Sequence, residues 1–315
     1  MLTADQIQFF DKKGYLVVED VLDQVAGVDP IRTEYAAVLD QVYQEWVSQG
    51  RVESVSGFEA QLRTGYAAGC DWFQPLDISL PGDRIEEDTP MHFGPAVFNM
   101  VTNQRLLDIV ETLIGPEITS NPIQHVRIKP PANLLSGDEV RPHVTFTDWH
   151  QDQGVTHDEA DNTQMVTVWL AISDATTENG CLQVIPGSHR EPLKTHCPAG
   201  IQLSIPDSEL PKDQAVPTPV KSGGIVVFHP KTAHSSLVNH SDGFRWSFDI
   251  RFNVTGQPTG RSHFPEFVAG SRANPDSVLS DWRVWRDMWR QARTRLAEKP
   301  HIPIHRWDSD HPVCA

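Results

Sequence analysis

The sequence predicts a mainly β protein whose core is an antiparallel sandwich or barrel, with helices at both ends of the chain. Short runs rich in β-branched and aromatic residues fill its middle, namely IQHVRI, MVTVWLAI, CLQVI, GIVVFH and RWSFDIRFNV. Turn signals such as Asn179-Gly180 separate these runs, whereas helical spacing appears only in the N-terminal part and in the tail. Short strands joined by tight turns favour an antiparallel core over βαβ units.

The N-terminal part is predicted to be mainly helical. Thr3 and Gln6 form a capping-box pattern, and Gly14 is suited to end the helix that starts there. The elements expected from these signals are helices over 4–13, 30–48 and 103–115 and a strand over 15–18. The region Gly65–Pro95 has no clear period and is rich in proline, so we expect a long ordered loop there.

The pattern indicates one catalytic domain over residues 1–315. Helices occupy residues 1–120, the β core runs from about 121 to 255, and a helical tail covers 256–315, with its helix between Asp276 and Lys299. The sequence contains no internal repeat, linker or low-complexity segment that would argue for a second unit.

Composition and charge exclude several classes of partner. The formal net charge of −16 disfavours nucleic acid and anionic membrane surfaces. No run of about 18 apolar residues is present, so we expect no membrane span. The N-terminus lacks the pattern of a secretory signal, and the four cysteines have no CxxC spacing. We therefore expect four reduced thiols and a cytoplasmic protein.

The segment TDWHQDQG suggests a metal site. His150 and Asp152 are two residues apart, so in an extended strand their side chains project from the same face. His234 follows 82 residues after Asp152 (234 − 152), in HPKTAHSSLVNH. Two histidines and one carboxylate with open positions are typical of non-heme iron(II) oxygenases. The alternative for such a short motif is a surface histidine beside a solvated aspartate.

Longer segments resemble the phytanoyl-CoA dioxygenase family of Fe(II)/2-oxoglutarate oxygenases. The matching pieces are WHQD, VTVWLAISDATTENGCLQVIPGSHR and GGIVVFHPKTAHSSLVNHSDGFRWSFDIRF, together with FFDKKGYLVVEDVL and IQHVRIKPP upstream. They extend from residue 3 to about 253, and the irregular GCLQVIPGSHR block is the most specific. The resemblance implies a double-stranded β-helix, the jelly roll of cupin-like proteins, with flanking helices.

The resemblance also implies residue roles. His150, Asp152 and His234 match the iron ligands, and Arg245, 11 residues after His234 (245 − 234), matches the arginine that binds 2-oxoglutarate. A guanidinium offers a planar fork to a carboxylate. The further matches around the oxoacid are Ser236, Trp169 and Lys129. Arg251 is the alternative to Arg245, because an even separation places both on one strand face.

The implied reaction uses Fe(II), 2-oxoglutarate and O2, and releases succinate and CO2. Asp152 is a carboxylate where halogenating relatives have a small residue, so hydroxylation of a small organic metabolite is the expected outcome. Desaturation, epoxidation and cyclisation are alternatives with the same iron chemistry. A metal-dependent hydrolase and a catalytically silent ligand-binding module are alternatives of other classes; neither explains Arg245 and Ser236 together with intact metal ligands.

Two regions are candidates for contacts with partners. The region Gly65–Pro95 and the segment Gln153–Gln164 are expected to form a lid over the substrate. The residues proposed to face the substrate are Trp72, Phe73, His92 and His125. In the tail, Trp282, Trp285 and Trp289 form an apolar stripe among arginines. This stripe is expected either to pack on the protein body or to form an interface between subunits.

Overall fold

A computed structural model describes residues 1–70, 72–82, 84–134, 147–199, 202–299, 304–307 and 312–314. Its helices are α1 (Ala4–Lys13), α2 (Asp29–Ser48), α3 (Phe58–Ala67), α4 (Phe73–Leu76), α5 (Pro95–Val101), α6 (Gln104–Ile114) and α7 (Trp282–Ala297). Its strands are β1 (Tyr15–Val18), β2 (Ile118–Lys129), β3 (Met165–Ala171), β4 (Leu182–Val184), β5 (Cys197–Ala199), β6 (Gln202–Ser204), β7 (Val216–Thr218), β8 (Ile225–Phe228), β9 (His234–Ser236), β10 (Arg245–Val254) and β11 (Phe267–Gly270).

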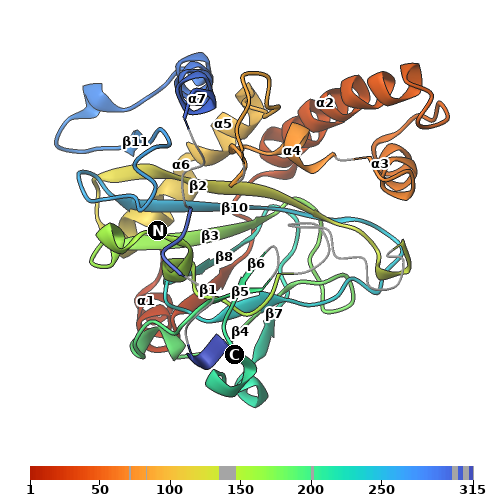
Figure 1. Cartoon of the computed structure of the whole chain (residues 1–315). Helices are drawn as coiled ribbons and strands as arrows, with labels where there is room; N and C mark the ends of the chain where they lie inside the picture. Colours follow the sequence, from red (N-terminus) through yellow and green to blue (C-terminus); the bar gives the residue numbers. More distant parts are fainter. Residues whose placement is uncertain are drawn as a thin grey trace.

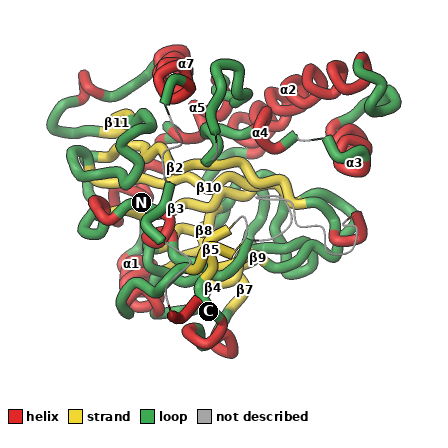
Figure 2. The backbone as a smooth tube through the Cα atoms, in the orientation of Figure 1, coloured by secondary structure: helices red, strands yellow, loops and turns green. Residues whose placement is uncertain are grey.

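The strands form antiparallel sheets, as the sequence predicts. The larger sheet has the order β1-β8-β3-β10-β2-β11, and a smaller sheet has the order β7-β4-β9. A short hairpin, β5-β6, forms a third sheet. Helices α2, α5, α6 and α7 lie on one side of the larger sheet, and the smaller sheet lies on the other side (Figures 1 and 2). The larger sheet is therefore the middle layer of the molecule.

The side chains of strand β10 point alternately into two different environments. Trp246, Phe248, Ile250 and Phe252 are buried with the helices in the main hydrophobic core. The residues between them point to the other face, because side chains alternate along a strand. These are the polar residues Arg245, Ser247, Asp249, Arg251 and Asn253, all of them mostly buried. The interior between the two sheets is thus lined with charge.

The N-terminal helices form where their sequence signals predict. Thr3 and Gln6 make both hydrogen bonds of the capping box, and Gly14 adopts the left-handed conformation at φ 79° that ends α1. Asn103 caps α6 with its side chain, as expected for a helix that starts near residue 103. The region Gly65–Pro95 is largely irregular, but it contains the end of α3 and the short helix α4.

The tail helix starts later than the sequence spacing predicts. Asp281 accepts a hydrogen bond from the backbone N–H of Arg283, and this cap starts α7 at Trp282. Trp285 and Trp289 are fully buried within the single chain, stacked with or edge-on to Phe93. The stripe therefore packs on the protein body, and an interface formed by the rest of α7 stays a prediction.

The expectation of four reduced thiols is wrong for two of them. Cys197 in β5 and Cys314 form a disulfide across a sequence separation of 117, while Cys70 and Cys181 are free and buried. The sequence could not reveal this pairing, because the two residues meet only when the tail folds back over the β core. In the described part of the chain no helix is long and apolar enough to cross a membrane. The cytoplasmic location stays a prediction.

Removing this disulfide should destabilise the protein. A cross-link over a separation of 117 residues restricts the unfolded chain, and native disulfides contribute about 2–4 kcal/mol. We expect the Cys197→Ser/Cys314→Ser double variant to lose about this much free energy of unfolding in a urea titration. Wild type with a thiol reductant should match the variant, and the variant itself should not respond to reductant. Equal stability of oxidised wild type and variant would contradict the pairing.

Candidate active site

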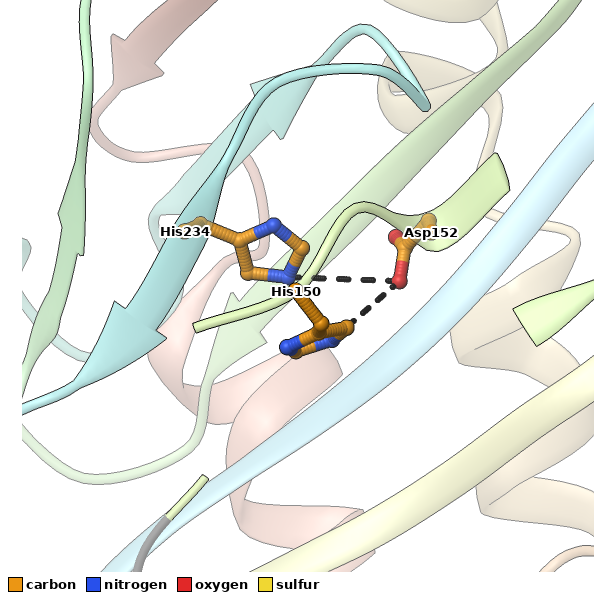
Figure 3. Close-up of side chains that lie close together, drawn as sticks. All are labelled: His150, Asp152 and His234. Atoms are coloured by element: carbon orange, nitrogen blue, oxygen red, sulfur yellow. Dashed lines mark ion pairs between the residues drawn. The ribbon is translucent and has the colours of Figure 1, made fainter. Parts of the chain in front are cut away.

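An antiparallel bridge brings the two candidate histidines together. The backbone N–H of each of His150 and His234 donates to the other's carbonyl oxygen at 3.0 Å. Their rings lie on the same side of this bridge, with centroids 4.2 Å apart. Figure 3 shows both rings beside the Asp152 carboxylate. One ligand atom from each of the three residues lies within 4.8 Å of the others, so together they can hold one metal ion.

Backbone carbonyls orient both imidazole rings. Nδ1 of His150 lies 2.8 Å from the carbonyl oxygen of Asp148, and Nδ1 of His234 lies 2.9 Å from that of Thr232. Each Nδ1 therefore carries the proton, and each Nε2 has its lone pair directed toward Asp152. Burial, reinforced by His150, lowers the pKa of His234 to about 3, so this ring is neutral near pH 7. Both histidines are prepared to bind a cation.

Asp152 lies at the start of a 3-10 turn, Asp152–Val155, and not in the strand that the sequence spacing predicts. The chain leaves the bridge at His150, passes through extended Gln151 and turns. The carboxylate still faces the histidines, with Oδ1 3.6 Å from His150 Nε2 and 3.9 Å from His234 Nε2. The turn changes the backbone conformation and keeps the spacing that one shared ion needs.

Two further side chains hold the Asp152 carboxylate. Arg251 donates to Oδ1 at 2.5 Å, and the Thr167 hydroxyl donates to Oδ2. Burial alone would raise the pKa of Asp152, but Arg251 and the two histidines lower it well below its usual range. The group is therefore an oriented carboxylate. Arg251 is engaged on the metal side of the cavity, which separates it from the residues around Arg245.

A second cluster lies at the other end of the same strand face. The Arg245 guanidinium donates to Ser247 Oγ at 2.6 Å and lies 5.0 Å from the centre of the Trp169 ring. Lys129, paired with Arg245 in the strand register, donates from Nζ to Ser236 Oγ at 2.7 Å. The structure thus brings together all four residues that the resemblance implies for the oxoacid.

Among the described residues, this second cluster is a cationic site without a carboxylate counterion. Arg245 and Lys129 are 2% and 3% exposed, and within the described ranges neither forms an ion pair with a carboxylate. Burial lowers the pKa of Arg245 to about 10 and that of Lys129 well below its usual value. The Nε of Arg245 has no hydrogen-bond partner. Buried cations of this kind are costly unless an anion pairs with them, so the cluster fits a bound carboxylate.

One cavity joins the two clusters. Its wall includes the three candidate metal ligands, Arg245, Ser236 and Trp169. The face of the metal triad that is not occupied by protein opens into this space. A carboxylate held by Arg245 and a group bound to the metal can therefore belong to one small molecule.

The four proposed substrate residues lie outside the wall of this cavity. Trp72 is buried in the main core, and His92 pairs with Glu34 at 2.9 Å. Phe73 and His125 are closer, because the Phe73 ring lies 6.0 Å from the Arg127 guanidinium carbon and Arg127 lines the cavity. Trp72 and His92 therefore pack behind the cavity, whereas Phe73 and His125 lie close to its wall.

Sequence reasoning missed four polar residues of the cavity wall: Arg127, Thr147, Thr167 and Asp249. Thr167 holds Asp152, and Arg127 pairs with Asp249 at 3.1 Å between Nε and Oδ2. A signal for Asp249 was present in RWSFDIRFNV, where a polar residue occurs at every second position between large apolar ones. In a strand this pattern marks one polar face, and a polar face in the middle of a sheet with both sides covered implies a functional interior.

Sequence comparisons match most of the chain. A family model described as phytanoyl-CoA dioxygenase (PhyH) matches residues 10–247. The Mus musculus protein named phytanoyl-CoA dioxygenase domain-containing protein 1 is 34% identical over 273 residues, covering 79% of this chain and 89% of its own length. Phytanoyl-CoA dioxygenase 1 of Oryza sativa subsp. japonica is 28% identical over 271 residues, covering 79% and 88%.

Solved structures match the fold. A non-heme monooxygenase, ThoJ in its apo form, aligns with a TM-score of 0.61 at 20% identity, covering 93% of this chain and 96% of its own. EvdO2 from Micromonospora carbonacea var. aurantiaca, complexed with 2-oxoglutarate, aligns with a TM-score of 0.50 at 20% identity, covering 81% and 92%. These likenesses confirm the predicted jelly-roll fold class with flanking helices.

His196 should make the protein sensitive to acid, because it supports the segment between the metal ligands. Its Nε2 accepts from the backbone N–H of Gln151 at 2.8 Å, and burial lowers its pKa from 6.5 to about 4. The unfolded chain therefore binds more protons between these values, and stability is lost as pH falls from about 6.5 to 4. We expect this histidine to account for about 3 kcal/mol of that loss.

Urea unfolding between pH 7.5 and 4.5 would measure the effect. The His196→Gln variant should lose less stability over this range than wild type, whereas a variant at the exposed His240 should follow wild type. Parallel pH profiles for wild type and His196→Gln would show that His196 is not a buried neutral ring.

Proposed function

The chain belongs to the phytanoyl-CoA dioxygenase family, and we propose that it is an Fe(II)/2-oxoglutarate-dependent dioxygenase that hydroxylates an unactivated C–H bond of a small organic metabolite. The metal is Fe(II), the co-substrate is 2-oxoglutarate, and O2 is the oxidant. Succinate and CO2 are released with the hydroxylated product. When bound, the iron would activate O2 for C–H cleavage, with the oxoacid as the donor of two electrons.

One observation carries this proposal: a two-histidine, one-carboxylate cluster and an uncompensated cationic site share a single cavity. The donor set suits iron(II), because it leaves three adjacent coordination positions free for an oxoacid and O2. The cationic site suits the distal carboxylate of the same oxoacid, since Arg245 and Lys129 are buried without a protein counterion. A dicarboxylate with an oxo group next to one carboxylate satisfies both clusters at once.

The chain's own residues bind, orient and exclude water. His150, His234 and Asp152 hold the ion, and Arg251 with Thr167 keeps the Asp152 carboxylate ionised and oriented. Arg245 binds the distal carboxylate of the oxoacid, and the hydroxyl of Ser236, shared with Lys129, provides a further donor. The Trp169 ring shields Arg245 from water, which strengthens the interaction with a carboxylate.

Other outcomes of the same chemistry are desaturation, epoxidation and cyclisation of the substrate. They use the same metal and oxoacid sites and differ in which substrate carbon is presented. A metal-dependent hydrolase is less consistent with the cavity, because activation of a bound water needs no buried arginine and lysine beside the metal. The partner of the enzyme is therefore a small molecule.

Asp152→Ala should abolish turnover without unfolding the protein. Changes to groups that merely orient a metal ligand reduce affinity or activity by 10–100-fold, so loss of a ligand should reduce 2-oxoglutarate turnover by about a hundredfold or more. Succinate release with Fe(II) measures the effect, and thermal melting checks the fold. Asp158→Ala, at an exposed position six residues further on, is the matched control and should retain full activity. An active Asp152→Ala protein would disprove the triad.

Arg245→Leu should weaken binding of 2-oxoglutarate selectively. Removing one partner of a buried ion pair costs about 3 kcal/mol or more, which corresponds to roughly a hundredfold rise in the Michaelis constant for the oxoacid. Calorimetry with the Mn(II)-loaded protein measures the dissociation constant of the oxoacid directly, without turnover. Arg251→Leu is the comparison, and it should weaken metal binding through Asp152 instead. If only Arg251→Leu shows the oxoacid effect, the two assignments must be exchanged.

A further inference from the structure

A third polar group in the cavity wall is used by neither the metal nor the oxoacid. Arg127 on β2 and Asp249 on β10 form an ion pair, with side chains 16% and 17% exposed. Both residues line the cavity that contains the metal triad. No hydrogen bond of the described residues links this pair to Arg245, Lys129 or Asp152, so it is distinct from both clusters.

The Asp249 carboxylate is only half satisfied. Its Oδ2 accepts from Arg127, whereas Oδ1 is buried and has no hydrogen-bond partner in the described part of the protein. Burial alone would raise the pKa of Asp249, but Arg127, His125 and Arg251 lower it below its usual value. An ionised carboxylate with an unused acceptor is uncommon in a protein interior. The side chain of Asp249 is 17% exposed and lines the cavity, so a donor group of a ligand can reach the carboxylate there.

The strand register places this oxygen between the two established clusters. On the inner face of β10, Asp249 follows Arg245 by four residues and precedes Arg251 by two, and Arg251 holds Asp152. Two strand residues span about 7 Å, so a group bound at Asp249 is within one small molecule's length of the metal. Asp249 also pairs in register with Trp169 and His125, which puts it at the centre of the sheet.

The charges that line the cavity determine which kind of hydrogen-bond donor the substrate can present to Asp249. Of the described residues, three arginines (Arg127, Arg245 and Arg251) and two aspartates (Asp152 and Asp249) line it, and Lys129 lies behind. Fe(II) and the 2-oxoglutarate dianion add no net charge, so these residues leave the loaded cavity positive and disfavour a cationic substrate. A neutral hydroxyl donor matches Asp249 without adding positive charge.

We propose that Asp249 is a substrate-binding residue whose carboxylate accepts a hydrogen bond from a hydroxyl group of the prime substrate, and that the substrate is a small, neutral, hydroxylated metabolite. This inference rests on the proposed function. The same cavity must also hold the oxoacid, so the substrate hydroxyl and the oxoacid share its wall. Leu182 and Phe228 give this wall its apolar surface. A bare hydrocarbon acyl chain would leave Asp249 unsatisfied.

The test combines a substrate screen with a binding measurement. The Fe(II)-loaded protein with 2-oxoglutarate is screened for stimulated succinate release against sugars, cyclitols and aromatic alcohols. Fatty acids and hexadecanoyl-CoA are included as compounds whose acyl chains carry no hydroxyl group. Binding of the best activator and of its deoxy analogue is then measured by calorimetry on the Mn(II)-loaded protein with 2-oxoglutarate. Wild type, Asp249→Ala and the similarly sized, apolar Asp249→Leu are compared, and 2-oxoglutarate binding confirms that both variants fold.

Wild type should bind the hydroxylated activator at least about tenfold more tightly than the deoxy analogue, because a site built for a donor rejects a ligand that lacks it. Both Asp249 variants should lose this preference. Asp287→Asn, which removes a carboxylate from the ion pairs with Arg286 and Arg290 on α7, outside the cavity, should keep it.

Three results would overturn the inference. They are a best activator without a hydroxyl group, a panel in which no hydroxylated compound stimulates, and a preference that survives in Asp249→Ala. Failure of the proposed function is seen separately, as a wild-type protein that neither binds 2-oxoglutarate nor converts it to succinate with Fe(II). If wild type converts 2-oxoglutarate but substitution of Asp249 leaves the binding preference unchanged, only the substrate assignment fails.

Discussion

The antiparallel bridge between His150 and His234 is the contact on which the whole active site depends. It joins positions 84 residues apart (234 − 150) and presents two imidazole rings on one side of the chain. Because each Nδ1 lies against a backbone carbonyl oxygen, the bridge also sets the tautomer of both rings. The position of Asp152 follows from the same bridge, since the chain turns immediately after it.

A second constraint is the cost of burying charge between two sheets. Desolvation of an ion is tolerated only where a partner, a metal or a ligand compensates it. Within the described residues, Asp152 is compensated by Arg251, and Asp249 is compensated by Arg127 through one oxygen. Arg245 and Lys129 have no such partner, which makes their end of the cavity a site for an anion.

The tail of the chain contributes to the support of this interior. Trp307 stacks on His196 and donates from its ring nitrogen to the carbonyl oxygen of Gly154 at 2.6 Å. Arg306 donates to the Gln153 carbonyl oxygen at 3.2 Å. Together with the disulfide at Cys314, these contacts hold the segment that follows Asp152. Rigid support of a ligand-bearing turn preserves the geometry that a metal needs.

By itself the sequence determined the fold class and the helix caps, because period-two patterns and turn signals are local properties of the chain. Its resemblance to a family pointed to the metal triad and to the residues proposed for the oxoacid, which the structure brings into one cavity. It did not determine the disulfide at Cys197, the burial of Trp72 or the 3-10 turn at Asp152, since these depend on which distant segments meet. The different contacts of Arg245 and Arg251 were also decided by tertiary structure. Their shared strand face allowed either assignment, and only the position of Asp152 beside Arg251 distinguished them.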